Sequence, residues 1–223
     1  MQTDPAGLAR VEAARYALLR RLALAMRHHM VVHLQPMGMI TELMERRLQT
    51  GQAGVQQVHQ SMSKIHDLAR AAVDSCLEVV TWLAPVPGAT IPLDEGVQEC
   101  LSLVRSNFSF RGFPVSDILA GVQAQVPRSA VRHVLPAVLL ALTDRAPPPA
   151  DVRVSTEALA AGGVIQVEVE PEAGDPGFPG NHPYRLLDWQ EVETLARAEG
   201  VTLTRGPASA RIELPQASPL LPA

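Results

Sequence analysis

The chain has 223 residues, of which 47% are hydrophobic and 19% are charged, and its formal net charge is −4. This composition is too apolar for a disordered protein, and the mild acidity gives no reason to expect a surface for nucleic acid or for an anionic membrane. No run of about 18 uncharged apolar residues is present, so a transmembrane helix is not expected. Because no secretory signal is recognisable and the chain has only two cysteines, Cys76 and Cys100, we expect a cytoplasmic protein with reduced thiols.

Residues 6–84 are rich in helix-forming residues and predict two long helices, over residues 6–49 and 53–83. Gly51 lies between them, where it can end the first helix and begin an antiparallel hairpin. Apolar residues in both segments recur at alternating steps of three and four, which is typical of a heptad-like seam. In the second helix this seam is expected to contain Val55, Val58, Met62, Ile65, Ala69, Ala72, Cys76, Val79 and Leu83.

The first helix carries more apolar residues than a single hairpin can bury. Six of them lie off its main seam: Leu19, Leu24, Val31, Val32, Met39 and Leu43. This surplus predicts that two hairpins associate as a dimeric four-helix bundle. The alternative is that the hairpin packs on the second half of its own chain.

After the turn at residues 85–88, β-branched residues, glycine and proline become more frequent, and short elements alternate. Strands are expected near residues 91–93, 113–119, 152–156, 164–170, 201–204 and 210–214, and helices near residues 94–108, 127–142 and 188–199. Asp94 and Asp188 are suited to cap two of these helices. The pattern predicts a mixed sheet covered on one face by three helices, and therefore an α+β protein with a helical hairpin followed by an α/β sandwich.

Three histidines cluster in the first helix, and helical phase separates them. At about 100° per residue, His33 falls on the seam, His29 lies at its edge and His28 points away from it. An exposed imidazole is partly neutral at pH 7 and is therefore available as a nucleophile. His29 and His33 have the spacing of a zinc-binding pair, but the helix offers no third ligand, so no metal site is expected.

The histidine cluster resembles a known motif. The segment from Arg27 to Gln35, with the tail Glu42-Leu43-Met44, resembles the H-box helix of sensor histidine kinases, and His28 matches the phosphoacceptor. A second version of the H-box places a proline five residues after the histidine. Aligned on Pro36, that version puts Val31 at the acceptor position and leaves the acceptor absent.

The second half of the chain resembles the GHKL ATPase domain of the same kinases in its order of elements. The similar segments are the N-box helix at residues 129–146, the following hairpin at 152–170, and the closing helix and strand pair at 187–215. The resemblance implies a dimerisation and histidine-phosphotransfer-like domain over residues 6–84 and a GHKL-like domain over residues 89–216.

Departures from the family imply that the GHKL-like domain is degenerate. His29 stands where the family usually has an acidic base, and Arg145 stands where its N-box has a Mg²⁺-binding asparagine. Of the glycine-rich box that approaches the nucleotide, only Asp175 and Gly177 remain. Because phosphoryl transfer from ATP depends on positioning and on charge neutralisation, we expect no bound cofactor and no ATP-dependent kinase activity.

The combination resembles the kinase-derived histidine phosphotransferases of bacterial phosphorelays, the ChpT type. This resemblance implies that His28 takes phosphate from one receiver-domain aspartate and passes it to another. Five neighbours are expected to dock the receiver: Leu24, Val31 and Val32 as an apolar patch, and Arg21 and Arg27 as attractants for its acidic site.

The alternative function is a catalytically inactive pseudokinase scaffold that binds or sequesters a response regulator. The replacement of the acidic base by His29 and the alignment on Pro36 both favour this alternative. Under either hypothesis, the expected partners are receiver domains and a second copy of the chain.

Overall fold

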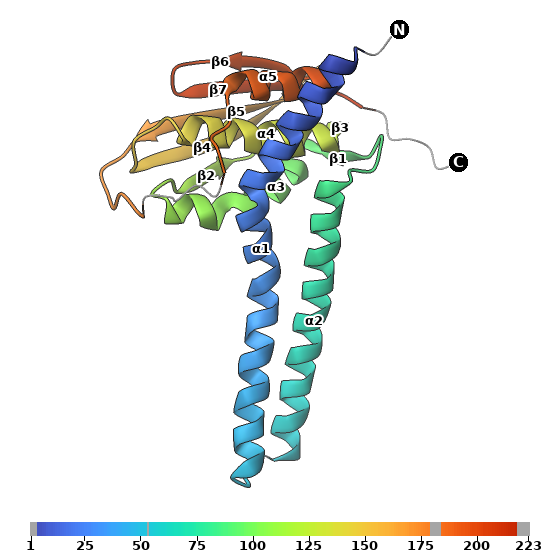
Figure 1. Ribbon diagram of the computed structural model, residues 1–223, viewed down its shortest axis with the longest axis vertical. Coiled ribbons are helices and arrows are strands. Elements are labelled where there is room, and N and C mark those ends of the chain that lie inside the picture. Colours follow the sequence, from blue (N-terminus) through green and yellow to red (C-terminus); the bar gives the residue numbers. More distant parts are fainter. Residues whose placement is uncertain (1–3, 53, 179–183, 218–223) are drawn as a thin grey trace. The chain divides into compact units, whose positions relative to one another are not determined.

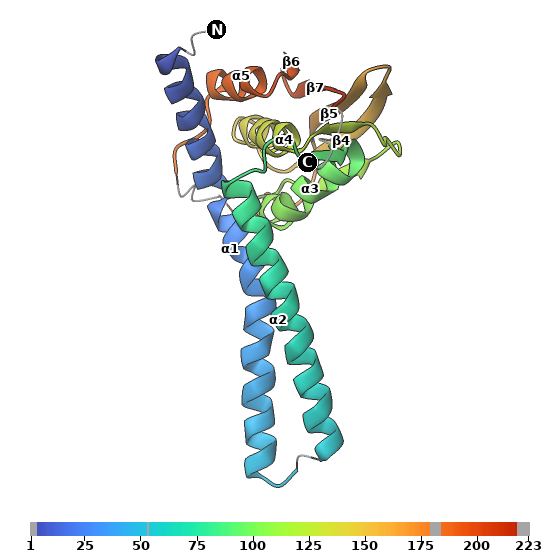
Figure 2. The same ribbon diagram turned by 90° about the vertical axis from the view of Figure 1, so that its right-hand side faces the viewer.

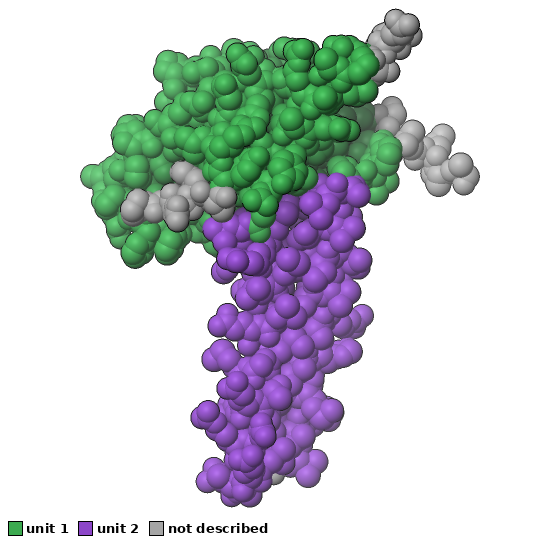
Figure 3. Space-filling model, in the orientation of Figure 1, with its two compact units in different colours: residues 1–23, 85–223 green, residues 24–84 purple. Residues whose placement is uncertain are grey.

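The computed structural model describes residues 4–52, 54–178 and 184–217. The chain forms two compact units, which are residues 24–84, called here the hairpin unit, and residues 1–23 with 85–223, called the α/β unit (Figure 3). The boundary falls inside the first helix, which contributes its first part to the α/β unit. The hairpin domain predicted over residues 6–84 includes this part, and its limits stay a prediction.

Two helices make up the hairpin, α1 (Pro5–Gln49) and α2 (Val55–Leu83), in agreement with the predicted ranges. In the hairpin unit they run antiparallel and side by side (Figure 1). Gly51 follows α1 with a φ of +67°, and its N–H donates to the carbonyl of Leu48 at 3.1 Å. A positive φ favours glycine over residues with a Cβ atom, so Gly51 ends the helix as expected.

The seam of α2 is narrower than predicted. Val58, Ile65 and Ala72 are buried or half-buried, whereas Val55 and Met62 are 88% and 65% exposed. Cys76 and Leu83 are exposed as well. The reason is that one partner helix covers only one face of α2, while steps of three and four spread the apolar residues over a wider arc.

The α/β unit is built on a five-stranded mixed sheet with the strand order β2-β4-β5-β7-β6. β2 and β4 are parallel and the other neighbours are antiparallel. A separate antiparallel ribbon joins β1 to β3. The elements in chain order are β1 (Thr90–Pro92), α3 (Leu93–Phe110), β2 (Val115–Ile118), β3 (Gln125–Pro127), α4 (Arg128–Thr143), β4 (Ala150–Leu159), β5 (Gly162–Pro171), α5 (Trp189–Ala198), β6 (Thr202–Arg205) and β7 (Ser209–Pro215).

Helices α3, α4 and α5 cover one face of the five-stranded sheet, as Figure 2 shows, which confirms the predicted mixed α+β architecture. The central helix α4 is buried at every position from Ala130 to Thr143. In β4, Ala150, Val152 and Val154 are buried and alternate with half-buried residues. This period of two is that of a strand with one face on the core.

The first part of α1 adds a third layer to the α/β unit. It runs across the helices on the side away from the sheet (Figure 2). Ala14, Ala17, Leu18 and Leu22 lie on one side of this segment and are each at most 1% exposed. The segment is therefore part of the core of this unit.

Two local features differ from the predictions. The strand β3 was not expected, because a segment of three residues has no measurable periodicity. Asp94 does not cap α3, which begins one residue earlier; its carboxylate instead accepts the backbone N–H groups of Gly121 and Val122 at 2.7 and 2.9 Å. Asp188 does cap α5, and its own N–H donates to Glu191 at 3.0 Å. In the described residues, no helix has the length and apolar character needed to cross a bilayer.

Candidate functional site

His28 lies on α1 within the hairpin unit, and its side chain is exposed. Helical phase places Leu24, Val31 and Val32 within about 60° of it on the same helix face. These three residues are 39%, 41% and 47% exposed, and Arg27 next to His28 is exposed too. His28 is therefore an accessible imidazole on an apolar surface.

His29 and His33 are held inside the hairpin unit. Both are half-buried, and their rings meet edge to face with centroids 6.2 Å apart. The Nε2 atom of His29 lies 3.3 Å from the Oε2 atom of Glu78 on α2. Of the three clustered histidines, His28 is thus the one whose ring faces solvent. No group of three metal-ligating side chains occurs among the residues that the structure describes.

Arg21 is the one predicted docking residue that the structure does not bring to an open surface. It belongs to the α/β unit, and its side chain is 2% exposed. Arg21 is two helical turns from His28 and in nearly the same phase, so the two residues lie on the same face of α1. The helical phase of a residue does not predict what covers that face of the helix. At Arg21 the face is covered by the α/β unit, whose Asp144 pairs with the guanidinium group.

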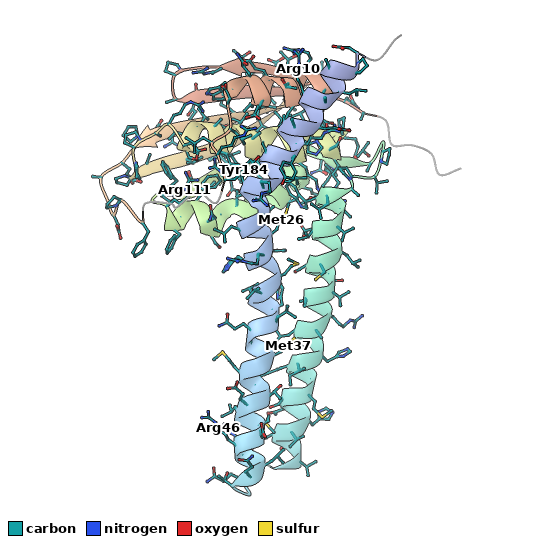
Figure 4. All side chains as sticks on the ribbon, viewed as in Figure 1. Arg10, Met26, Met37, Arg46, Arg111 and Tyr184 are labelled. Atoms are coloured by element: carbon teal, nitrogen blue, oxygen red, sulfur yellow. The ribbon has the colours of Figure 1, made fainter. Side chains whose placement is uncertain are left out.

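Asp144, directly after α4, is the centre of a buried charge cluster. Its carboxylate accepts two hydrogen bonds from Arg21, at 2.7 and 2.8 Å, and one from Arg111 at 3.0 Å. The Asp144 side chain is fully buried, and Arg111, labelled in Figure 4, lies at the end of α3. Burial lowers the pKa of Arg111 from its usual value, although the charge of Asp144 opposes this shift. The cluster joins α1, α3 and α4.

Tyr184 adds an aromatic contact to the same segment of α1. Its ring meets that of Tyr16 edge to face with centroids 6.2 Å apart, and the guanidinium carbon of Arg20 lies 5.2 Å from its centroid (Figure 4). Arg21 also reaches the carbonyl of Arg185 at 3.4 Å. The chain just before α5 therefore packs on α1.

Arg145, predicted to replace the Mg²⁺-binding asparagine, makes contacts with the protein itself. Its guanidinium donates to the carbonyl of Ala141 at 2.9 Å and to that of Leu187 at 3.4 Å. A cation at this place also complements the negative end of the dipole of α4. The end of the N-box-like helix thus presents a fixed positive charge.

Gly177, interpreted from the sequence as a remnant of a glycine-rich box, is required by the protein's own backbone. Its φ is +65°, and a Cβ atom there would lie 2.5 Å from the nitrogen of Gly112 and 2.7 Å from the carbonyl oxygen of Phe110. The next residue, Phe178, stacks on Phe110 with centroids 4.8 Å apart. Asp175 accepts the N–H of Gly177 at 2.9 Å. Asp175 and Gly177 therefore hold the loop against the end of α3.

A second buried acid, Glu199 at the end of α5, was missed by sequence reasoning. Its carboxylate binds Arg15 at 2.8 Å, Ser129 at 2.7 Å and the Nδ1 atom of His133 at 2.7 Å. Burial by itself would raise the pKa of Glu199, but the hydrogen bonds from His133 and Ser129 outweigh it and hold the pKa at about 2. The i, i+4 spacing of Ser129 and His133 was the available signal in the sequence.

No protein-family model matches the chain, and no curated protein sequence matches it. Its fold is similar to that of several solved structures. A bacterial phosphotransferase is 14% identical with a TM-score of 0.42, and the match covers 96% of this chain and 98% of the other. The histidine kinase AdeS of Acinetobacter baumannii is 12% identical with a TM-score of 0.40, over 83% and 98% of the two chains. The mycobacterial sensor histidine kinase MprB is 16% identical with a TM-score of 0.41, over 60% and 99%.

Proposed function

We propose that the chain is a histidine phosphotransferase of a bacterial phosphorelay, in which His28 shuttles phosphate between receiver-domain aspartates. The observation that carries the proposal is the exposure of His28 beside Leu24, Val31 and Val32. A receiver that covers these apolar residues would gain about 25 cal/mol for each Å² buried, and it would bring its aspartyl phosphate to the imidazole. Arg27 next to His28 supplies positive charge for an acidic partner.

The transfer is a pair of balanced displacements. The neutral imidazole of His28 attacks phosphorus, the bond between phosphorus and the aspartyl oxygen breaks, and the aspartate leaves as a carboxylate. In the second step the carboxylate of another receiver attacks the phosphohistidine, and the imidazole leaves. Each step needs an accessible nitrogen, because attacking and leaving groups lie in line with phosphorus.

No step of this proposed transfer uses ATP. Asp144 is engaged by Arg21 and Arg111, and Arg145 by two backbone carbonyls. A fixed cation at the end of the N-box-like helix disfavours a divalent cation there by like-charge repulsion. The GHKL-like domain then has a structural role and no catalytic one.

The proposal also includes a homodimer formed through the hairpin unit. One face of α2 carries a line of exposed apolar residues that the hairpin itself does not cover: Val55, Met62, Val73, Leu77 and Val80. On a helical projection of α2, all five side chains lie within about 40° of one line parallel to the helix axis. The exposed His59 and His66 lie in the same arc, between these apolar residues. We expect this mostly apolar stripe to pack on a second copy of itself about a two-fold axis, as in four-helix bundles.

The test is transfer of label from a phosphorylated receiver of the same organism to the full-length chain. Wild type, His29→Ala and His33→Ala are expected to take up label and to pass it to a second receiver, whereas His28→Ala takes up none. Label that persists in His28→Ala would contradict the assignment. Mg-ATP with its label on the γ-phosphate, added without a receiver, is expected to label none of the variants.

The same labelling experiment distinguishes the phosphotransferase from the pseudokinase scaffold. Exposed Leu24, Val31 and Val32 suit a scaffold as well as a transferase, because docking alone requires no chemistry. A wild type that binds the receivers but takes label from none of them would favour the scaffold. In both cases Val32→Asp is expected to weaken receiver binding, since it places a charge in the apolar patch.

A further inference from the structure

A small, partly open pocket of about 200 Å³ lies on the α/β unit, between the end of α4, the start of α5 and the turn that joins β6 to β7. Its lining includes the exposed residues Arg145, Pro147 and Arg205. Its walls include Leu142, Ala150 and Val169, which are each at most 5% exposed. Trp189, at the start of α5 and also 5% exposed, forms another wall. The pocket is therefore apolar and has an indole face on one side.

Two guanidinium groups also line this pocket, those of Arg145 and Arg205. Their central carbons lie 6.0 and 4.7 Å from the centroid of the Trp189 ring. Arg145 is held by the carbonyls of Ala141 and Leu187. Within the described part of the chain, no carboxylate forms an ion pair with either arginine. Two exposed positive charges therefore border one apolar pocket, and none of the described residues balances them with a negative charge.

We propose that this pocket binds a small monocyclic organic anion, an aromatic carboxylate of the size of benzoate. The ring would lie against Trp189 and the apolar walls, and the carboxylate would pair with Arg205 and Arg145. Ligand sites in proteins commonly combine apolar walls with a few charged groups that fix orientation. Arginine is well suited to a carboxylate, because its planar fork donates two parallel hydrogen bonds.

Size decides against larger anions. A cavity of about 150 Å³ holds one benzene molecule, so about 200 Å³ leaves room for one ring and one acidic group. A nucleoside triphosphate, with its base, its sugar and three phosphates, is larger than this volume. The site is thus distinct in ligand class from a kinase nucleotide site, and it does not depend on His28.

The experiment is calorimetric titration of the full-length chain with benzoate and with benzamide, which has nearly the same shape but no charge. Benzoate is expected to give a saturable isotherm. Benzamide is expected to bind at least about tenfold more weakly, because it lacks one charge-assisted contact. Arg205→Gln should weaken the binding of benzoate by a similar factor. Arg197→Gln, which removes an exposed arginine from α5, is the matched control and should change nothing.

Three results of these direct titrations would overturn the proposal. These are equal affinities for benzoate and benzamide, an Arg205→Gln variant that binds benzoate like the wild type, and the absence of a saturable isotherm with benzoate. Displacement of benzoate by Mg-ATP at micromolar concentration would identify a nucleotide site and would also contradict it. Because Arg205 is exposed, its replacement is expected to leave the fold intact, which circular dichroism checks.

Discussion

Asp144 shows how a fully buried acid can serve the fold. A fully buried carboxylate is stable only when cations and hydrogen bonds compensate its lost hydration, and Arg21 and Arg111 supply both. The pair with Arg21 is bidentate, with distances of 2.7 and 2.8 Å. The same interaction removes Arg21 from any role in attracting a partner.

Replacing Asp144 by Asn is expected to lower the free energy of unfolding by about 3 to 5 kcal/mol, because two buried guanidinium groups then lose their counter-charge. Urea denaturation followed by circular dichroism measures this difference. The control is Glu170→Gln, which breaks the surface pair with Arg153 and should cost about 1 kcal/mol or less. Similar losses in the two variants would show that the Asp144 cluster contributes little.

Glu199 gives the protein a stability that depends on pH. Its pKa is about 2 in the folded chain, below the usual 4.5, so between these values the unfolded state binds more protons. Stability from Glu199 is therefore complete above about pH 4.5 and is lost as the pH falls toward 2. Glu199→Gln should be less stable than wild type at neutral pH, and its stability should fall less steeply below pH 4.5. Parallel stability curves for the two proteins in acid would contradict this assignment.

At the scale of elements, the backbone conformation and backbone contacts of Gly177 fix the loop after β5. Gly177 has a positive φ and lies against the chain at Phe110 and Gly112. Gly177→Ala is expected to destabilise the α/β unit by about 2 kcal/mol or more, from the unfavourable φ and from the close contact. At Gly174 in the same loop, a Cβ atom would have no neighbouring atom within 4 Å, so Gly174→Ala is the matched control and should be neutral in the same denaturation experiment. Equal effects of the two substitutions would refute the explanation.

The elements that the sequence predicted well are those with a long, regular pattern. Helix α4 is mostly apolar and is buried from Ala130 to Thr143, and β4 alternates along its first residues. The short strand β3 and the position of Asp94 were not predictable, because each depends on a partner distant in the chain. The same holds for Arg21 and Glu199, whose partners are brought together by packing of α1 on the α/β unit.

At the scale of the whole molecule, α1 is one continuous helix that serves two units. Its first part contributes Leu18 and Leu22 to the core of the α/β unit, and its second part carries His28 in the hairpin unit. A substitution that loosens the first part, such as Asp144→Asn, therefore acts on stability without touching the docking residues. A variant of Val32 is expected to act on the proposed receiver docking and to leave the core of the α/β unit unchanged.

The apolar stripe on α2 predicts the assembly. Val73, Leu77 and Val80 are 57%, 60% and 55% exposed in the single chain, and a stable dimer buries about 1,600 Å² in total. Light scattering is expected to give twice the monomer mass of 24.0 kDa at micromolar concentration. Leu77→Glu places a charge in the stripe and should shift the protein to a monomer, since an unpaired buried charge is costly. Gln60→Glu adds the same charge about 100° around the helix from Leu77 and about 140° from the midline of the stripe, and should remain a dimer. A wild type with the mass of a monomer would contradict the predicted dimer. A Leu77→Glu variant that is still a dimer would show that the interface lies elsewhere.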